Sequence, residues 1–341
     1  MSAAPTRPAP GPSSPVLSVR DLQVHFRIPA SPWPWVPPNT LRAVNGISLE
    51  LAAGETLGVV GESGCGKSTL ARALINLVPR TSGEVVWMGK PLEPGDSRGW
   101  HDLRQHVQMI FQDPLASLNP RWTVEQIIAE PLHLHRPQLG AAAIREQVHE
   151  MMRRVGLRTD MLNRYPHEFS GGQCQRIGIA RALVLRPRVV ICDEPVSALD
   201  VSIQAQIVGL LRELQAELDL TLIFIAHDLA VVRHLCDRVL VLYLGQMMEL
   251  GPCREVFAQP AHPYTRALIS AIPVPDPEVE RQRRPELLGG DLPSPLALPS
   301  GCPLHTRCPQ AEARCASETP RAQAVDTSGL HLSSCWKSAH A

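Results

Sequence analysis

The stretch Gly61-Glu62-Ser63-Gly64-Cys65-Gly66-Lys67-Ser68 fits the pattern G-x-x-x-x-G-K-[ST] and decides the fold class. It follows the apolar run ETLGVVG (55–61) and opens a helical pattern that extends to about Leu77. The glycines allow backbone N–H groups to turn inward around phosphate oxygens, and the helix N-terminus adds partial positive charge. Lys67 can reach the β- and γ-phosphates, and the Ser68 hydroxyl can hold magnesium. The alternative without a binding function is a glycine-rich turn with a solvated lysine, but the strand–loop–helix context favours a phosphate loop.

An apolar run that ends in two acids, Val189-Val190-Ile191-Cys192-Asp193-Glu194, is the second chemical feature. The carboxyl ends of parallel strands form the ligand-binding edge of a sheet, so we expect Asp193 to take magnesium there. Glu194 can polarise an attacking water as a general base, a role typically worth roughly 10²–10⁴ in rate. A strand end that meets a solvated turn would explain the two acids alone, and the phosphate loop favours the catalytic interpretation.

Strand and helix patterns alternate along most of the chain, which predicts an α/β fold with a mostly parallel core sheet. The runs VVIC and LIFI are continuously apolar, as expected for parallel strands that are covered on both faces. The segment from about Asp113 to Arg164 is mostly helical, with Pro114, Pro120, Pro131 and Pro137 as expected interruptions. Strand patterns occupy 16–27, 41–51, 55–61, 85–89, 107–111, 189–193, 221–226 and a closing pair in 238–251, and the other helical patterns occupy 172–185 and 201–218.

Composition excludes several classes of protein. The 341 residues include 33 Lys+Arg and 33 Asp+Glu, and a formal net charge of zero argues against a nucleic-acid binder that relies on phosphate neutralisation. No stretch approaches the roughly 18 apolar residues of a membrane-spanning helix, and the Pro-rich residues 1–15 contain no apolar segment of a secretory signal. We expect 1–15 to be a disordered tail and 30–39 to form a Pro/Trp loop. The nine cysteines are too few for a disulfide scaffold, and Cys65, Cys174, Cys192 and Cys236 are expected to be packing residues.

The pentapeptide Phe169-Ser170-Gly171-Gly172-Gln173 precedes a helical pattern, and by itself it would be a glycine turn with Ser170 as a helix cap. It resembles the signature sequence of ATP-binding-cassette (ABC) ATPases, with Phe in place of the usual Leu. Other elements follow in the family's order: Gln112 matches the Q-loop glutamine, Ser197-Ala198-Leu199-Asp200 the D-loop, and His227 the switch histidine. The resemblance implies a P-loop ABC ATPase domain over 16–258, with an antiparallel β subdomain and a helical insertion at about 113–170.

The resemblance also implies roles for individual residues. Members of the family enclose two ATP molecules between two subunits, so Ser170, Gly171 and Gly172 are assigned to the partner's nucleotide. Phe26 aligns with the aromatic residue that stacks on adenine, and an inward-facing strand phenylalanine is the alternative. The implied catalytic residues are Lys67, Glu194 and His227, and the implied magnesium residues are Ser68, Gln112 and Asp193. The implied nucleotide-binding set is Phe26, Gly61, Glu62, Ser63, Gly64, Cys65, Gly66, Lys67, Ser68, Thr69, Gln112, Ser170, Gly171, Gly172, Gln173 and Asp200.

The C-terminal part, 259–341, is similar to the extension of the peptide/nickel import branch, and specifically of oligopeptide permease F-type ATPase subunits, through HPYTRALISAIP at 262–273. From about Pro273 the composition shifts to Pro, Arg and Cys, which predicts a separate, loop-rich tail. Four thiolates can hold a [4Fe–4S] cluster or zinc, but no C-x₂-C pair is present. An iron–sulfur cluster is implied in some members of the branch, and zinc or unligated thiols stay open as alternatives. The thiols concerned are those of Cys302, Cys308, Cys315 and Cys335.

The resemblance implies an ATP- and Mg²⁺-dependent ATPase subunit of a bacterial importer, which couples hydrolysis to oligopeptide uptake at the cytoplasmic face of the inner membrane. The implied partners are a second ATPase subunit, with a heterodimer favoured, two membrane permease subunits that dock near Gln112–Leu118, and a peptide-binding protein. Import of dipeptides or nickel complexes is an alternative cargo. A soluble ABC ATPase that acts on DNA or ribosomes is the alternative class. It is disfavoured because the interval from Ser68 to Ser170 has no room for a long coiled coil and the chain has one set of cassette motifs.

Overall fold

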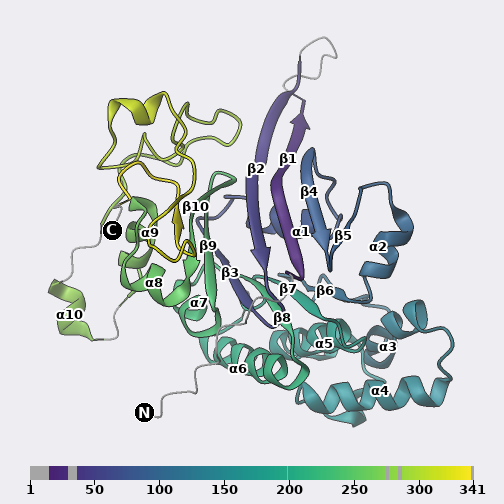
Figure 1. Ribbon diagram of the computed structural model, residues 1–341. Helices are drawn as coiled ribbons and strands as arrows, with labels where there is room; N and C mark the ends of the chain where they lie inside the picture. The colour runs from purple at the N-terminus through teal and green to yellow at the C-terminus, as the bar shows by residue number, and fades with distance from the viewer. Residues whose placement is uncertain (1–14, 30–36, 198, 274–275, 283–285, 339–341) are drawn as a thin grey trace.

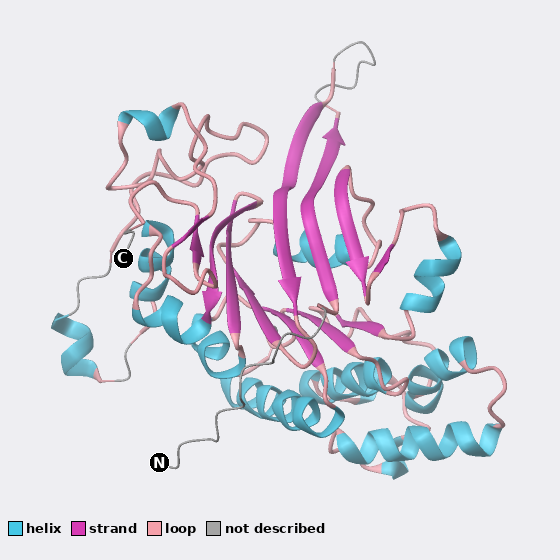
Figure 2. Cartoon of the chain, in the orientation of Figure 1, coloured by secondary structure: helices cyan, strands magenta, loops and turns pink. Residues whose placement is uncertain are grey.

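The computed structural model describes residues 15–29, 37–197, 199–273, 276–282 and 286–338. Within these residues the strands form two sheets, and helices cover the larger one (Figure 1; Figure 2). Most of the expected N-terminal tail and of the Pro/Trp loop, namely 1–14 and 30–36, lies outside the described residues.

The larger sheet has the strand order β11-β12-β10-β9-β3-β8-β7-β6. The neighbours from β9 to β6 are parallel, which confirms the predicted mostly parallel core, and β10, β12 and β11 continue the sheet antiparallel. Every residue of β3, β7 and β8 is buried, as their unbroken apolar sequences predict. The bounds are β3 Thr56–Val60, β6 Val107–Ile110, β7 Val189–Asp193, β8 Thr221–Ile225, β9 Arg238–Tyr243, β10 Gln246–Pro252, β11 Gln323–Ala324 and β12 Leu332–Ser333.

The smaller sheet is antiparallel, in the order β2-β1-β4-β5, and it confirms the expected β subdomain. Its inner face, helix α1 (Lys67–Leu74) and one face of the larger sheet share a hydrophobic core. The indole Nε1 of Trp87 donates a 2.8 Å hydrogen bond to the carbonyl oxygen of Leu74 and ties the sheet to α1. Helix α1 ends before the expected Leu77, because Asn76 adopts a left-handed φ of 57°. The strand bounds are β1 Leu17–Ile28, β2 Asn39–Leu51, β4 Ser82–Trp87 and β5 Lys90–Pro91.

Helices on the other face of the larger sheet form a second core with it (Figure 1). The expectation that Pro131 interrupts the helical segment is wrong, because Pro131 is buried inside α3. A capping box between Thr123 and Gln126 fixes the start of α3, and its packing against α5 outweighs the backbone hydrogen bond that a proline cannot make. The bounds are α3 Val124–His135, α4 Ala141–Arg154, η1 Thr159–Met161, η2 Pro166–Glu168, α5 Gly171–Leu183, α6 Val201–Leu218, α7 Leu229–Leu235 and α8 Cys253–Ala258. Helix α2, Ser97–Leu103, instead packs in the first core through Trp100 and Leu103.

The C-terminal segment is joined to the cassette, which corrects the expectation of a separate tail. Strand β12 pairs with β10 and adds β11 to the sheet edge. The side chain of Glu249 on β10 lies 2.7 Å from His331 Nε2 and also accepts from the backbone N–H of His262 at 2.9 Å. Both histidines are buried, so these buried polar contacts anchor the tail to the sheet. The remaining elements are α9 Pro263–Ser270, α10 Pro277–Gln282 and η3 Ala313–Ala316.

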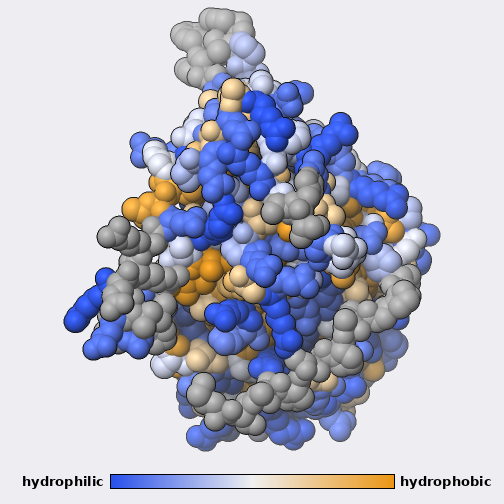
Figure 3. Space-filling view, turned by 60° about the vertical axis from the view of Figure 1, so that its left-hand side comes forward, coloured by the Kyte–Doolittle hydropathy of each residue, from blue (hydrophilic) through white to orange (hydrophobic). Residues whose placement is uncertain are grey.

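The surface on the side of the extension is mostly hydrophilic, with separate apolar patches (Figure 3). In the described residues, no helix has both the length and the apolar character needed to cross a bilayer. Among the described residues of the extension, the exposed large apolar ones are Leu287, Leu292, Leu296 and Leu330.

Candidate nucleotide-binding site

The phosphate loop connects the end of β3 to the start of α1, as the motif predicts, and two of its glycines are sterically required. Gly61 has a φ of 150°, and an added Cβ there would lie 2.2 Å from the carbonyl oxygen of Leu242. Gly66 is the N-cap of α1 with a φ of 105°, and an added Cβ would lie 2.1 Å from the carbonyl oxygen of Ala43. In both cases the added Cβ would clash with a backbone carbonyl oxygen, which cannot move aside as a side chain can. Only glycine therefore allows the loop to pack this closely against the neighbouring backbone.

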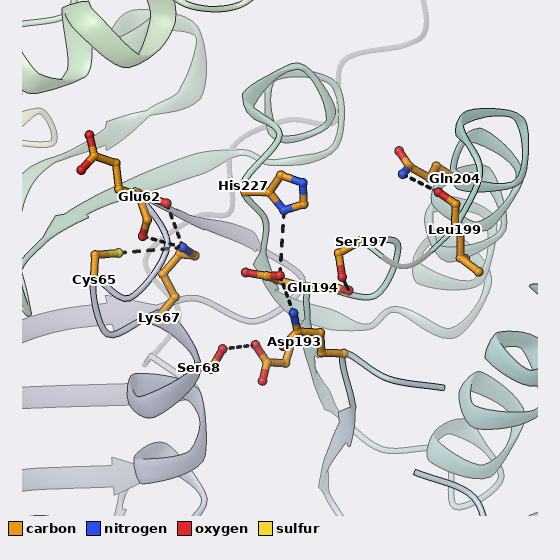
Figure 4. Close-up of polar contacts among 12 residues, drawn as sticks. Glu62, Cys65, Lys67, Ser68, Asp193, Glu194, Ser197, Leu199, Gln204 and His227 are labelled. Atoms are coloured by element: carbon orange, nitrogen blue, oxygen red, sulfur yellow. Dashed lines mark hydrogen bonds and ion pairs between the residues drawn. The ribbon is translucent and has the colours of Figure 1, made fainter. Parts of the chain in front are cut away.

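Lys67 is 4% exposed and its ammonium is held inside the loop (Figure 4). Its Nζ donates to the carbonyl oxygens of Gly61 at 2.8 Å and Glu62 at 3.1 Å, and it lies 3.9 Å from Cys65 Sγ. Burial raises the pKa of the Cys65 thiol, which keeps it a neutral neighbour of the ammonium. The loop therefore presents a fixed positive charge where the motif is expected to receive phosphates.

Ser68 and Asp193 meet, as the sequence predicts for a magnesium site. Ser68 Oγ donates a 2.7 Å hydrogen bond to Asp193 Oδ1, and Asp193 is the fully buried last residue of β7. In the described part of the chain the other oxygen, Oδ2, accepts no hydrogen bond, and it lies 3.5 Å from Nη2 of Arg72. Across the described residues, no group of three or more His, Cys, Asp or Glu side chains is arranged to hold a metal. A hydroxyl and one carboxylate suit Mg²⁺, which keeps several waters and shares its ligands with substrate phosphates.

Three predicted polar residues converge from three strand ends, and Figure 4 shows two of them, Glu194 and His227. Glu194 follows β7 with a left-handed φ of 47°, and its side chain is 16% exposed. Its Oε2 accepts a 2.9 Å hydrogen bond from Nε2 of Gln112, which follows β6, and lies 3.9 Å from Nδ1 of His227, which follows β8. Gln112, predicted as a magnesium residue, thus contacts the candidate base rather than Ser68 or Asp193. The geometry places a carboxylate base between a hydrogen-bond donor and an imidazole.

The signature pentapeptide occupies the start of α5. Ser170 is an exposed N-cap whose Oγ accepts from the N–H of Gln173 at 3.4 Å, while Gln173 Oε1 accepts from the N–H of Ser170 at 3.0 Å. Gly172 faces α6, since an added Cβ would lie 2.7 Å from Ile203 Cγ2. Asp200, the exposed N-cap of α6, has no side-chain capping bond. The signature thus lies against α6 at Gly172, and its role toward a partner's nucleotide stays a prediction.

Phe26 lies half-buried on β1 opposite Leu41 and packs against the core below the smaller sheet. This position is compatible with either a stacking surface or a core side chain, so the adenine contact also stays a prediction.

Sequence reasoning missed two contacts of the phosphate loop. The backbone N–H of Glu62 donates to the hydroxyl of Tyr264 at 2.9 Å, and the Glu62 carboxylate pairs with Arg307. The motif pattern leaves position 62 open to any residue, so no local signal predicts partners this far along the chain.

The four tail cysteines line one small cavity together with His262, His305 and Trp336. Burial, followed by smaller effects that include the three other thiols, raises the pKa of Cys302 to about 11. The cysteines are gathered, yet the described residues hold no set of ligands arranged around a metal. The structure therefore supports the convergence of the thiols and leaves the iron–sulfur cluster without support. The cysteines of the cassette are buried, which confirms their role as packing residues.

Comparison with known proteins finds similar sequences along nearly the whole chain. Residues 44–197 match the family model described as ABC transporter, and residues 248–315 match the model described as oligopeptide/dipeptide transporter, C-terminal region. The chain is 58% identical to the oligopeptide transport ATP-binding protein OppF of Salmonella typhimurium over 94% of its own length and 96% of the relative's. An OppF of Escherichia coli matches with the same identity and coverage.

A solved structure with the same fold is cbiO1 of Clostridium perfringens, described as part of the ABC transporter complex cbiONQ. It has a TM-score of 0.62 and 30% identity over 72% of this chain and 92% of that one. The dimeric cassette MJ0796, bound to ADP and Pi, has a TM-score of 0.62 and 26% identity over 70% and 99%. The family models, the relatives matched over nearly their whole length and the solved structures of the same fold show that the chain belongs to the ABC transporter ATPases, in the branch of the oligopeptide transport ATP-binding proteins.

Proposed function

We propose that this chain is the ATP-hydrolysing subunit of a bacterial peptide importer. The observation that carries the proposal is the meeting of Lys67, the Ser68–Asp193 pair and Glu194 at the ends of β3 and β7. A cation, a magnesium-type oxygen pair and a candidate base in one site are the parts that hydrolysis of a phosphoanhydride needs. The names of the relatives, oligopeptide transport ATP-binding proteins, supply the cargo class.

The residues of the chain divide the work of hydrolysis. Lys67 and the loop N–H groups bind the phosphates, and Ser68 with Asp193 would hold Mg²⁺, which neutralises charge on the phosphates when bound. Glu194 takes a proton from the attacking water, and the hydrogen bond from Gln112 orients its carboxylate. We assign His227, 3.9 Å from the same carboxylate oxygen, to contact with the terminal phosphate.

Ser170, Gly171 and Gly172 complete the site of a partner subunit in this proposal. The exposed N-cap at Ser170 supports it, because the N-terminus of α5 presents N–H groups that favour an anion. The dimeric state of the related cassette MJ0796 agrees with such a pair. We infer a heterodimer with a second ATPase subunit, two permease subunits that dock near Gln112–Leu118, a delivering peptide-binding protein, and a peripheral position at the cytoplasmic face of the inner membrane. We also propose the division into a cassette at 16–258 and an extension at 259–341.

The test uses the full chain in its assembled membrane complex, reconstituted in vesicles. Lys67→Ala should lose MgATP binding, hydrolysis and uptake of labelled peptides together, whereas Arg145→Gln, on the surface of α4, should retain all three. Peptides of graded length and a nickel complex identify the cargo. Retention of ATP binding by Lys67→Ala would contradict the phosphate-loop assignment, and uptake of the nickel complex alone would contradict peptide transport.

We propose as a separate point that the four tail cysteines hold a [4Fe–4S] cluster. Four thiols around one cavity have the donor chemistry that such a cluster takes. Their present arrangement is not that of a metal-binding group, so the thiols would have to move closer to a common centre. Protein purified without oxygen should contain about four iron per chain, and a Cys308→Ser/Cys315→Ser variant should lose that iron. Iron-free wild-type protein would exclude the cluster, and stoichiometric zinc in its place would show the alternative ligand.

A further inference from the structure

Glu62, the second residue of the phosphate loop, is held at three of its atoms. Its carbonyl oxygen accepts from Lys67 Nζ, its N–H donates to the hydroxyl of Tyr264, and its carboxylate binds Arg307. The carboxylate points away from the Lys67 ammonium (Figure 4). Lys67 belongs to the loop itself, whereas Tyr264 and Arg307 belong to the C-terminal extension. The extension therefore contacts the phosphate loop, which is proposed to bind ATP.

The contact with Arg307 is a close and partly shielded ion pair. Arg307 Nη1 lies 2.9 Å from Oε2 and 3.2 Å from Oε1 of Glu62, with the two side chains 12% and 28% exposed. The same nitrogen lies 3.4 Å from the hydroxyl of Tyr243, and the guanidinium lies 5.8 Å from the centre of that ring. Burial opposes the charge, but the hydrogen bonds to Glu62 and Tyr243 and the charge of Glu62 outweigh it, so the pKa of Arg307 is raised. Arg307 therefore neutralises a carboxylate beside the phosphate site.

The contact with Tyr264 fixes the backbone of the same residue. Tyr264 lies on α9 and is fully buried, and its ring is 4.8 Å from that of Tyr243, centre to centre. The hydroxyl is therefore held in place by packing, and it engages the Glu62 N–H at 2.9 Å. This N–H is directed at the extension rather than into the loop, so the hydrogen bond serves to fix the loop's path.

We propose that Arg307 and Tyr264 are positioning residues for the ATPase reaction, through which the C-terminal extension holds the phosphate loop and cancels the charge of Glu62. The inference rests on the proposed function, because it assumes that the loop binds ATP. Without Arg307, the Glu62 carboxylate would stand uncompensated near a highly charged triphosphate, and the repulsion would weaken binding. Without the Tyr264 hydroxyl, a half-buried N–H would lose its partner and the loop would lose one constraint.

The test measures MgATP affinity of the full-length chain, by competition with a fluorescent nucleotide. Arg307→Met should weaken binding about tenfold, equivalent to about 1.4 kcal/mol. Glu62→Gln removes the carboxylate charge, so adding Arg307→Met to Glu62→Gln should cause less than about a twofold further loss. A merely structural arginine would weaken binding equally in both backgrounds. Tyr264→Phe keeps the packed ring and should weaken binding roughly threefold.

Arg266→Met is the matched control, because Arg266 is another arginine of the extension and pairs with Glu286 and Gln310 instead of the loop. Its affinity should equal that of the wild type. In the assembled complex, Arg307→Met should raise KM for ATP and leave kcat within about twofold.

The failures can be told apart. If the wild-type chain does not bind MgATP, or if Lys67→Ala binds as well as wild type, the proposed function fails. If wild type binds MgATP and Lys67→Ala does not, two results overturn the positioning role. One is MgATP affinity equal to wild type in both Arg307→Met and Tyr264→Phe. The other is a loss of affinity on Arg307→Met that is just as large in the Glu62→Gln background. Should Arg307→Met prove unfolded by its melting curve, Tyr264→Phe alone decides: a loss of affinity supports the role and an unchanged affinity overturns it.

Discussion

Replacement of Glu194 by glutamine separates proton transfer from every other property of the site. Glutamine has nearly the shape of glutamate, and its amide oxygen can still accept the hydrogen bond that Gln112 now donates to Glu194 at 2.9 Å. The 16% exposed side chain also stays packed as before. The change therefore removes one negative charge and one base and leaves the phosphate loop and the Ser68–Asp193 pair intact.

The expected magnitude follows from the role of that base. Loss of a general base costs roughly 10²–10⁴ in rate, or about 3–5 kcal/mol of activation barrier. The variant should bind MgATP with an affinity within about threefold of wild type, because the carboxylate contacts Gln112 and His227 and not the loop. ATP that binds without being hydrolysed should trap the closed pair of ATPase subunits.

The assay is release of phosphate by the assembled complex at saturating MgATP, with nucleotide affinity measured in parallel. Glu150→Gln is a suitable control, since this carboxylate on α4 pairs with Arg154 and Arg186 away from the site. A kcat for Glu194→Gln close to that of wild type would refute the reasoning, because the proton would then be taken by another group. A parallel loss of affinity would show that the substitution distorts the site.

Three further predictions concern the interface, the thiols and the core. Ser170→Arg places a long cation at an exposed N-cap. Hydrolysis by the assembled pair should therefore be lost, while the isolated chain should bind MgATP normally. Weaker MgATP binding by the isolated chain would contradict the assignment of Ser170 to the partner's site. Burial raises the pKa of Cys192 and of Cys253 to about 12, so roughly one thiol in 10⁴ is ionised at pH 8. Iodoacetamide should therefore modify these two thiols only after unfolding. Rapid labelling of the native protein, measured by mass spectrometry, would conflict with their burial. Trp87→Phe removes the 2.8 Å hydrogen bond to the Leu74 carbonyl and should lower the free energy of unfolding by about 1–3 kcal/mol in urea titrations. An unchanged unfolding midpoint would mean that this hydrogen bond contributes nothing to stability.

The sequence was most informative where local pattern and buried environment agree. Helix α6 has the predicted bounds Val201–Leu218, and β7 and β8 are the parallel, fully buried strands that their apolar runs indicated. Prediction failed where packing overrode a local rule. Pro131 is a helix breaker by its chemistry, yet it lies inside α3 because the buried face of that helix is held against α5.

The sequence by itself determined the family and indicated the candidate chemistry, because the phosphate loop, the acids that end a strand and the signature pentapeptide are each defined by residues at fixed short spacings. Only the tertiary structure decided which distant groups meet. It joined Gln112 to Glu194, attached the tail to β10 through β12, and set Arg307 against Glu62, 245 positions away in the chain. Spacing along the chain constrains neighbours through backbone geometry, whereas contacts between remote segments depend on how whole elements pack, and no local pattern encodes that packing.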